Sequence, residues 1–252
     1  MAKDNRRIDR TSTYAEVLRD DLSRFYEIIE ELKKRQGGML SFEAAERRQL
    51  QKVKGIYFIF EAGEWRGGGE AHPRVVRVGT HGVTTGTKST LWSRLSQHRG
   101  STSGGGNHRT SIFRRHVGTA LQRSGVNPLV PGWEIRKTAP AAQQEIERAI
   151  EARVSQLIRA MHFLWLPLDD DEDPETGPGT RGYMERNAIA LLASASARQA
   201  DPSSASWLGR HAESIKISSS GLWNVRHVGE PADAEFLERF ESAVRFISLK
   251  PR

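Results

Sequence analysis

Residues 53–98 constrain the fold of this chain more than any other stretch, because two strand patterns and a helix pattern follow one another there. The run from Val53 to Phe60 is dense in β-branched and aromatic residues, a composition typical of a buried strand. A second such run covers residues 74–79, after a glycine-rich connection. Residues 90–98 have the apolar spacing of an amphipathic helix. This order predicts a small sheet followed by a helix that packs on it.

The helix at 90–98 carries two side chains suited to phosphate chemistry. Arg94 and His98 are four positions apart, so they project from the same helix face. A guanidinium binds two phosphate oxygens at once, and an imidazole exchanges protons near neutral pH. Together with Tyr57 on the first strand, they form a set that would cut a phosphodiester. A core tyrosine and a solvent-facing arginine are the alternative interpretations.

These residues resemble the signature of the GIY-YIG nuclease family, and in particular its branch of restriction enzymes and stand-alone nucleases. Gly55-Ile56-Tyr57 matches the first motif literally, Val76-Arg77-Val78-Gly79 occupies the place of the second, and Arg94 with His98 matches the helix pattern. The resemblance covers residues 53–228 with long insertions. It implies an α/β (α+β) fold, with a small, mostly antiparallel three-stranded sheet flanked by helices.

The resemblance also implies roles for a tyrosine and a glutamate. Tyr57 would be the general base that activates water, and Glu185, on the helix after the third strand, would bind Mg²⁺ or Mn²⁺. A free tyrosine has a pKa near 10, so only about one in a thousand is ionised at neutral pH. Arg94, the metal or a histidine would have to favour the phenolate. Judged by its position alone, Glu185 is equally expected to stabilise the helix by interacting with the positive N-terminal end of the helix dipole.

Four further positions complete the expected catalytic set. His108 would support His98, since a second histidine recurs at that distance in the family, and Asn224 would lie near the active site. A turn-forming asparagine is the alternative. The chain departs from the family at Arg77, which replaces the tyrosine of the second motif. Either Arg77 contacts the phosphate or His81 takes the vacated place, or the chain binds DNA without cutting it.

The positive charge of the chain is concentrated in one block. Residues 71–133 contain nine Lys and Arg and no Asp or Glu, whereas the whole chain has 38 basic and 31 acidic residues. Such a block would attract polyanions, although a solubilising basic face is the alternative. The glycine-rich loop at 101–107 lies inside it. We expect seven side chains to bind the DNA backbone: Arg74, Lys88, Arg99, Asn107, Arg109, Arg114 and Arg115.

The remainder of the chain reads as mostly helical. An N-terminal helical arm of residues 1–52 would precede a nuclease domain of residues 53–252, packing on it or on a second copy. The acidic run at 169–173 lacks the pattern of a calcium loop and is expected to be solvated. Further predicted elements are helices at 13–36, 42–51, 108–123, 141–160, 181–197 and 233–247, and a third strand at 162–168.

Composition narrows the class of protein. The absence of cysteine excludes disulfides and thiolate metal sites. The longest apolar run, residues 161–168, is too short to cross a bilayer, and no apolar segment follows the N-terminus, so we expect a soluble cytoplasmic protein. The best-supported hypothesis is a magnesium-dependent DNA endonuclease of restriction, anti-phage or repair type, possible as a homodimer. Alternatives are a DNA-binding protein that has lost catalysis, an RNA-directed nuclease and a structural protein.

Overall fold

A four-stranded antiparallel sheet lies at the centre of the described part of the chain, in the order β1-β4-β2-β3. The computed structural model describes residues 14–67, 72–81, 89–101, 103–135, 137–168 and 180–247. The predicted mixed α/β fold is confirmed. The fourth strand was not predicted, because two residues are too few to show a periodic pattern. The strands are β1 (Leu40–Ser41), β2 (Gly55–Trp65), β3 (Pro73–Thr80) and β4 (His162–Pro167).

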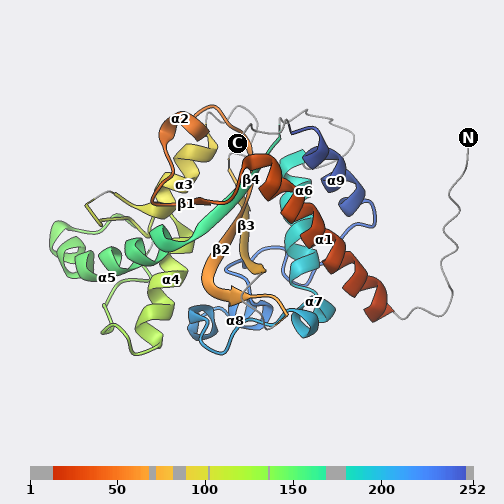
Figure 1. Ribbon diagram of the computed structural model, residues 1–252. Helices are drawn as coiled ribbons and strands as arrows, with labels where there is room; N and C mark the ends of the chain where they lie inside the picture. Colours follow the sequence, from red (N-terminus) through yellow and green to blue (C-terminus); the bar gives the residue numbers. More distant parts are fainter. Residues whose placement is uncertain are drawn as a thin grey trace, which may run out of the picture.

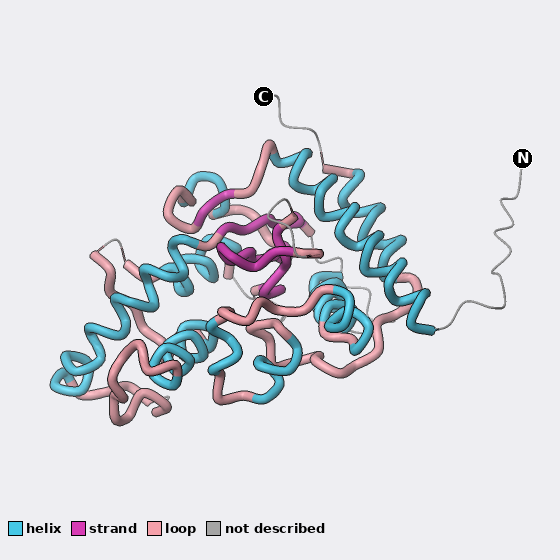
Figure 2. The backbone as a smooth tube through the Cα atoms, turned by 60° about the horizontal axis from the view of Figure 1, so that its bottom comes forward, coloured by secondary structure: helices cyan, strands magenta, loops and turns pink. Residues whose placement is uncertain are grey.

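Helices cover both faces of this sheet, with α1, α6 and α9 on one side and α3, α4 and α5 on the other (Figure 1). The view in Figure 2 shows the same arrangement from below, with the strands enclosed between the two groups. None of the described helices is long and apolar enough to cross a membrane. The helices are α1 (Tyr14–Gln36), α2 (Arg47–Leu50), α3 (Leu91–Arg99), α4 (Ile112–Arg123), α5 (Ala141–Ala160), α6 (Thr180–Leu192), α7 (Ala195–Ala200), the 3₁₀ turn η1 (Leu208–His211), α8 (Ile215–Ser220) and α9 (Phe236–Arg245).

Two predicted helices differ from those observed. The helix expected at 181–197 ends at Leu192, and Ser194 caps a separate helix, α7, by accepting a hydrogen bond from the Ala197 N–H. The helix expected at 42–51 is reduced to the single turn of α2. In both cases the apolar spacing was correct over part of the range, but local capping interrupts it.

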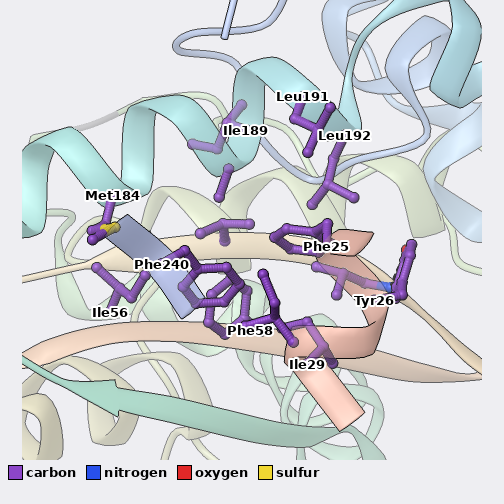
Figure 3. Close-up of a cluster of buried hydrophobic side chains, with 14 of the residues drawn as sticks. Phe25, Tyr26, Ile29, Ile56, Phe58, Met184, Ile189, Leu191, Leu192 and Phe240 are labelled. Atoms are coloured by element: carbon purple, nitrogen blue, oxygen red, sulfur yellow. Dashed lines mark hydrogen bonds between the residues drawn. The ribbon is translucent and has the colours of Figure 1, made fainter. Parts of the chain in front are cut away.

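Alternation along β2 builds one core on each face of the sheet. Ile56, Phe58 and Phe60 point to the side of α1, α6 and α9. Figure 3 shows this cluster, in which the Phe25 ring of α1 stacks on Phe240 of α9 with centroids 5.5 Å apart. The N-terminal helix is therefore built into the core, and β1 behind it pairs with β4.

The second core contains Tyr57 and lies under α3, α4 and α5. Ile150, Val154 and Ile158 of α5 face this core, whereas Ile146, near the start of the helix, is 57% exposed. Two glutamates of α5, Glu147 and Glu151, are buried as well. Their presence there is explained by ion pairs with Arg109 and Arg114.

Candidate active site

A chain of three buried side chains runs from the sheet into the start of α4. The Tyr57 Oη lies 2.8 Å from Nε2 of His98, and Nδ1 of His98 lies 2.7 Å from Oγ of Ser111. Each of the three residues is fully buried. Ser111 is also the N-cap of α4, where its Oγ accepts a hydrogen bond from the Arg114 N–H. The packing of β2, α3 and the N-terminus of α4 thus places Tyr57 next to His98.

The glycine of the second motif makes room for the tyrosine of the first. Gly79 lies directly opposite Tyr57 in the β2–β3 pairing. A Cβ at Gly79 would come within 2.3 Å of the Tyr57 hydroxyl oxygen. Gly55 is required in a similar way, since a Cβ there would lie 2.0 Å from the Leu166 carbonyl oxygen of β4. Both motif glycines are therefore explained by close packing around the tyrosine strand.

His98 is neutral in this environment. Burial lowers the pKa of its imidazole well below the usual value, and the positive charges of Arg94, Arg77 and Arg114 lower that pKa further. Arg94, Arg77 and Arg114 belong to α3, β3 and α4 respectively. A neutral imidazole carries one N–H and one lone pair, so it can donate one hydrogen bond and accept another.

Glu185, on α6, is the carboxylate of the same region. Burial raises the pKa of the Glu185 carboxyl, whereas Arg77, His227, the Thr80 N–H and Arg94 favour its ionised form. Arg77 and Arg94 thus act on both Glu185 and His98. The charges of these two arginines thus influence both the predicted histidine and the predicted carboxylate.

Arg77, whose charge acts on both His98 and Glu185, is itself held in place by neighbouring groups. Its side chain is 7% exposed, its Nη1 donates to the Trp223 carbonyl at 2.6 Å, and its guanidinium lies 4.9 Å from the Phe113 ring centroid. The residue that replaces the second tyrosine is thus held rigidly, by groups from α4 and from the segment before Asn224. His81, at the end of β3, is buried, and its carbonyl accepts a hydrogen bond from Arg181 at 2.6 Å.

The donor set around Glu185 suits magnesium better than zinc. Within the described residues no three His, Cys, Asp or Glu side chains come together as a ligand group. Magnesium commonly uses one or two carboxylates, keeps several waters and takes its remaining ligands from substrate phosphates. Glu185 offers one carboxylate of this kind, whose ionised form is favoured by Arg77 and Arg94 although burial raises its pKa. The residues present therefore fit an open, one-carboxylate magnesium site.

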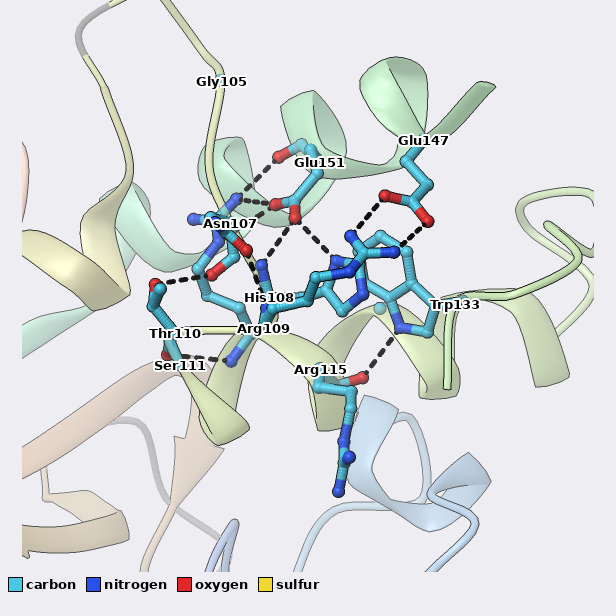
Figure 4. Close-up of polar contacts among 12 residues, drawn as sticks. Gly105, Asn107, His108, Arg109, Thr110, Ser111, Arg115, Trp133, Glu147 and Glu151 are labelled. Atoms are coloured by element: carbon cyan, nitrogen blue, oxygen red, sulfur yellow. Dashed lines mark hydrogen bonds and ion pairs between the residues drawn. The ribbon is translucent and has the colours of Figure 1, made fainter. Parts of the chain in front are cut away.

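His108 lies in a different polar cluster, shown in Figure 4. Its Nδ1 and its backbone N–H both contact Glu151 Oε1, at 2.9 and 2.7 Å, and its ring stacks on Trp133 with centroids 3.8 Å apart. The expectation that His108 supports His98 directly does not fit these contacts. Burial alone would raise the pKa of Glu151, but hydrogen bonds from His108 and the charge of Arg114 hold that pKa below its usual value.

Three of the arginines expected on DNA are held by carboxylates of the protein. Arg114 is fully buried and pairs with Glu151 at 2.5 Å. Arg74 is 3% exposed and pairs with Glu64. Arg109 makes two hydrogen bonds to Glu147, at 2.6 and 2.7 Å. A DNA-backbone role for Arg74 and Arg114 is therefore a wrong expectation, because their charges are already compensated inside the fold.

The other four residues expected to contact DNA differ in their contacts and exposure. Arg99 donates to the Ala45 carbonyl at 2.9 Å, and Asn107 is exposed on the loop before α4. Arg115 is half-buried, and in Figure 4 its side chain extends away from the His108–Glu151 cluster. Lys88 and the acidic run at 169–173 lie outside the described residues.

Asn224 acts on the edge of the sheet. Its side-chain oxygen accepts from the Val78 N–H at 3.1 Å, and its amide nitrogen donates to the Val78 carbonyl at 2.8 Å. The neighbouring Trp223 N–H donates to the Val76 carbonyl at 2.7 Å. This segment therefore covers the open edge of β3 and fixes the strand that carries Arg77.

Sequence reasoning did not single out three residues near the site. Ser111 had the signal of a capping serine, but nothing local links it to His98. Burial, with Arg77 and Arg115, lowers the pKa of His116 to about 4. His227 has a positive φ of 62°, unusual for a residue with a side chain, and its Nδ1 lies 3.0 Å from Glu230. That backbone conformation has no sequence signal.

The comparison with known families agrees with this arrangement. A family model described as a GIY-YIG domain matches residues 16–249, a range that includes most of α1 as well as the sheet and the site. No curated protein and no solved structure matches the chain. Because the family match spans more than half of the chain, the protein belongs to the GIY-YIG nuclease family, whose members are endonucleases.

Proposed function

We propose that this protein is a metal-dependent DNA endonuclease in which Tyr57 activates water. The observation that carries the proposal is the 2.8 Å contact between Tyr57 Oη and His98 Nε2, next to a carboxylate and two arginines that act on the same histidine. Phosphodiester hydrolysis needs an activated water, stabilisation of the charge on the phosphate, and a route for the leaving oxygen. These groups meet the first two needs.

Arg94 is the cation best placed to bind the scissile phosphate. It is half-buried, and its one hydrogen bond within the described residues is a 3.3 Å contact with the Gln97 side chain. Its Nε is buried and has no hydrogen-bond partner there. A guanidinium held in this way has donors left for phosphate oxygens. Arg77, which already donates to the Trp223 carbonyl, would add positive charge beside it.

In the proposed reaction the phenolate of Tyr57 removes a proton from water while the water oxygen attacks phosphorus. The bond from phosphorus to the deoxyribose oxygen breaks, and that oxygen takes a proton from solvent. Glu185 would hold Mg²⁺ or Mn²⁺, which, when bound, neutralises charge on the phosphate and the leaving oxygen. Arg94 keeps the phosphate in line with the attacking water.

A plasmid cleavage assay with magnesium tests this function. Wild type is expected to cut, whereas Tyr57→Phe and Glu185→Gln are expected to bind the plasmid without cutting it. Mapped ends would distinguish one-strand from two-strand cutting, and RNA of the same sequence would test the nucleic-acid preference. A restriction, anti-phage or repair role would follow from the cut sites.

Arg77 in place of a tyrosine favours a second candidate, a DNA-binding protein without catalysis. Under that hypothesis the wild type and both variants bind DNA equally, with an affinity that falls steeply as salt rises, and none of them cuts. Cleavage by wild type alone would reject it.

A further inference from the structure

The surface arginines of this protein differ in whether a carboxylate neutralises them. Several on α1, α6 and α9 are paired with glutamates: Arg24–Glu241, Arg35–Glu31, Arg186–Glu230, Arg239–Glu235 and Arg245–Glu241. Arg123, the last residue of α4, and Arg210, in η1, are exposed and have no carboxylate partner within the described residues. A phosphate is attracted more strongly to an arginine whose charge is not already compensated by the protein.

Arg123 and Arg210 come together from distant parts of the chain. The Arg123 Nε donates to the His211 carbonyl at 3.1 Å, so η1 lies against the C-terminal end of α4. The short helix α8, which carries the exposed Lys216, packs on η1 in turn. Figure 1 shows α4 and α8 in the lower part of the view, apart from α1 and α9. The unpaired arginines and Lys216 therefore lie on one side of the molecule.

The outer face of α4 carries no negative charge. The helix has no Asp or Glu, and its residues that are not buried are spaced as expected for one helix face: Ile112, Arg115, His116, Thr119 and Arg123. The segment at 202–229, which includes η1 and α8, has one acidic residue, Glu213, and three basic ones, Arg210, Lys216 and Arg226. A surface of this composition attracts polyanions.

This face of α4 begins at the candidate active site. Ser111, the N-cap of the helix, contacts the His98 ring at 2.7 Å. Arg115 and Arg123 are eight positions apart, which is about 12 Å along a helix. That distance corresponds to about three to four base-pair steps of DNA at about 3.4 Å each. A duplex with its scissile phosphate in the site is therefore long enough to follow α4 towards η1.

We propose that the α4–η1 surface, defined by Arg115, Thr119, Arg123 and Arg210, binds the backbone of the DNA duplex beside the cleaved phosphate. The inference rests on the proposed function, since it takes double-stranded DNA as the partner. It gives Arg123 and Arg210 a role in phosphate binding that the sequence did not suggest. Arg210 lies outside the acid-free block at 71–133, so only the fold brings it next to Arg123.

Salt-dependent binding of a short fluorescein-labelled duplex, measured by anisotropy without divalent metal, tests the surface. The logarithm of the binding constant falls with the logarithm of salt concentration, with a slope of about −0.9 for each phosphate contact. Arg123→Gln combined with Arg210→Gln removes two cations, so the slope should become shallower by about 1.8. The affinity at physiological salt should fall about tenfold, the effect of two exposed ion pairs.

The matched control is Arg239→Gln combined with Arg245→Gln, which removes the same charge from α9. The slope and affinity of this control should equal those of wild type. An unchanged slope in the Arg123→Gln, Arg210→Gln variant would overturn the inference. An equal loss in the α9 control would also overturn it, because the effect would then come from net charge and not from this surface.

A single thiol on the α4–η1 surface provides a second measurement, because the chain has no cysteine of its own. Thr119→Cys places the thiol on the outer face of α4, and Ser242→Cys places it at an exposed position of α9. Saturating duplex should block maleimide labelling of Thr119→Cys and leave that of Ser242→Cys unchanged. Equal labelling of Thr119→Cys with and without duplex would overturn the inference. Neither measurement needs cleavage, so failure of the nuclease function would be seen separately in the plasmid assay.

Discussion

Two polar clusters of this protein each combine a histidine with arginines, and they are built differently. In the cluster around His108, Arg114 and Arg109 each have a glutamate of α5 as partner. In the site around His98, the carboxylate of Glu185 is influenced by two guanidinium groups, those of Arg77 and Arg94. The first cluster is electrically balanced and joins α4 to α5. Among the described residues, the second has two guanidinium groups for this one carboxylate, as expected of a site that receives an anion. The predictions below test this division, from the largest expected effect to the smallest.

Removing the Tyr57 hydroxyl is expected to have the largest effect on cleavage. Tyr57→Phe should lower the rate by about 10²–10⁴-fold, the usual contribution of a general base. The unfolding free energy should fall by about 1–3 kcal/mol, because the fully buried Nε2 of His98 loses its hydrogen-bond partner while the ring packing remains. Plasmid cleavage and urea unfolding measure the two effects. Tyr183→Phe, which removes a hydroxyl bonded to Asp233 outside the site, is the control and should cut normally.

Breaking the balanced cluster should affect stability instead. Glu151→Ala leaves Arg114 buried without its carboxylate, which should lower the unfolding free energy by about 3–5 kcal/mol. Glu145→Ala on the same helix breaks the exposed ion pair with Arg148 and should cost about 1 kcal/mol or less. Urea unfolding compares them. If Glu151→Ala and Glu145→Ala lowered the unfolding free energy equally, the buried cluster would contribute no more to stability than an exposed ion pair.

Arg94→Ala should reduce cleavage by about 10²–10³-fold, the effect of losing one preorganised group that stabilises the transition state. Its unfolding free energy should remain close to wild type, since Arg94 makes only a long hydrogen bond to Gln97 within the described part of the chain. Arg148→Ala, at an exposed side chain of α5, is the matched arginine control. If Arg94→Ala unfolds like Glu151→Ala while still cutting, the division between the two clusters is wrong.

The pH dependence of stability should reveal His116. Its pKa is lowered to about 4, whereas an unfolded histidine titrates near 6.5, so the unfolded state takes up the proton first as pH falls. Stability from this group is therefore complete above pH 6.5 and is lost as pH falls from there towards 4. Between pH 7 and pH 5 the loss is about 2 kcal/mol at most. Urea unfolding of His116→Gln should show a flatter pH profile than wild type.

The acid-free block shows why charge along a sequence does not map directly onto a surface. Residues 71–133 contain no acid, yet Arg74, Arg109 and Arg114 are paired with carboxylates from β2 and α5. Those partners lie 10 to 38 positions away in the chain. Net charge over a window therefore identifies the block, but the fold decides which of its arginines remain for DNA.

What the sequence determined by itself follows from local spacing. Runs dense in β-branched and aromatic residues predicted β2, β3 and β4, and the four-residue interval between Arg94 and His98 placed both on α3, because these patterns depend only on neighbours in the chain. The tertiary structure alone decided that Ser111 meets His98, that Arg77 donates to the Trp223 carbonyl, and that Glu151 neutralises Arg114. Each of these contacts joins different elements, so its energy depends on how the helices pack on the sheet, which no local pattern records.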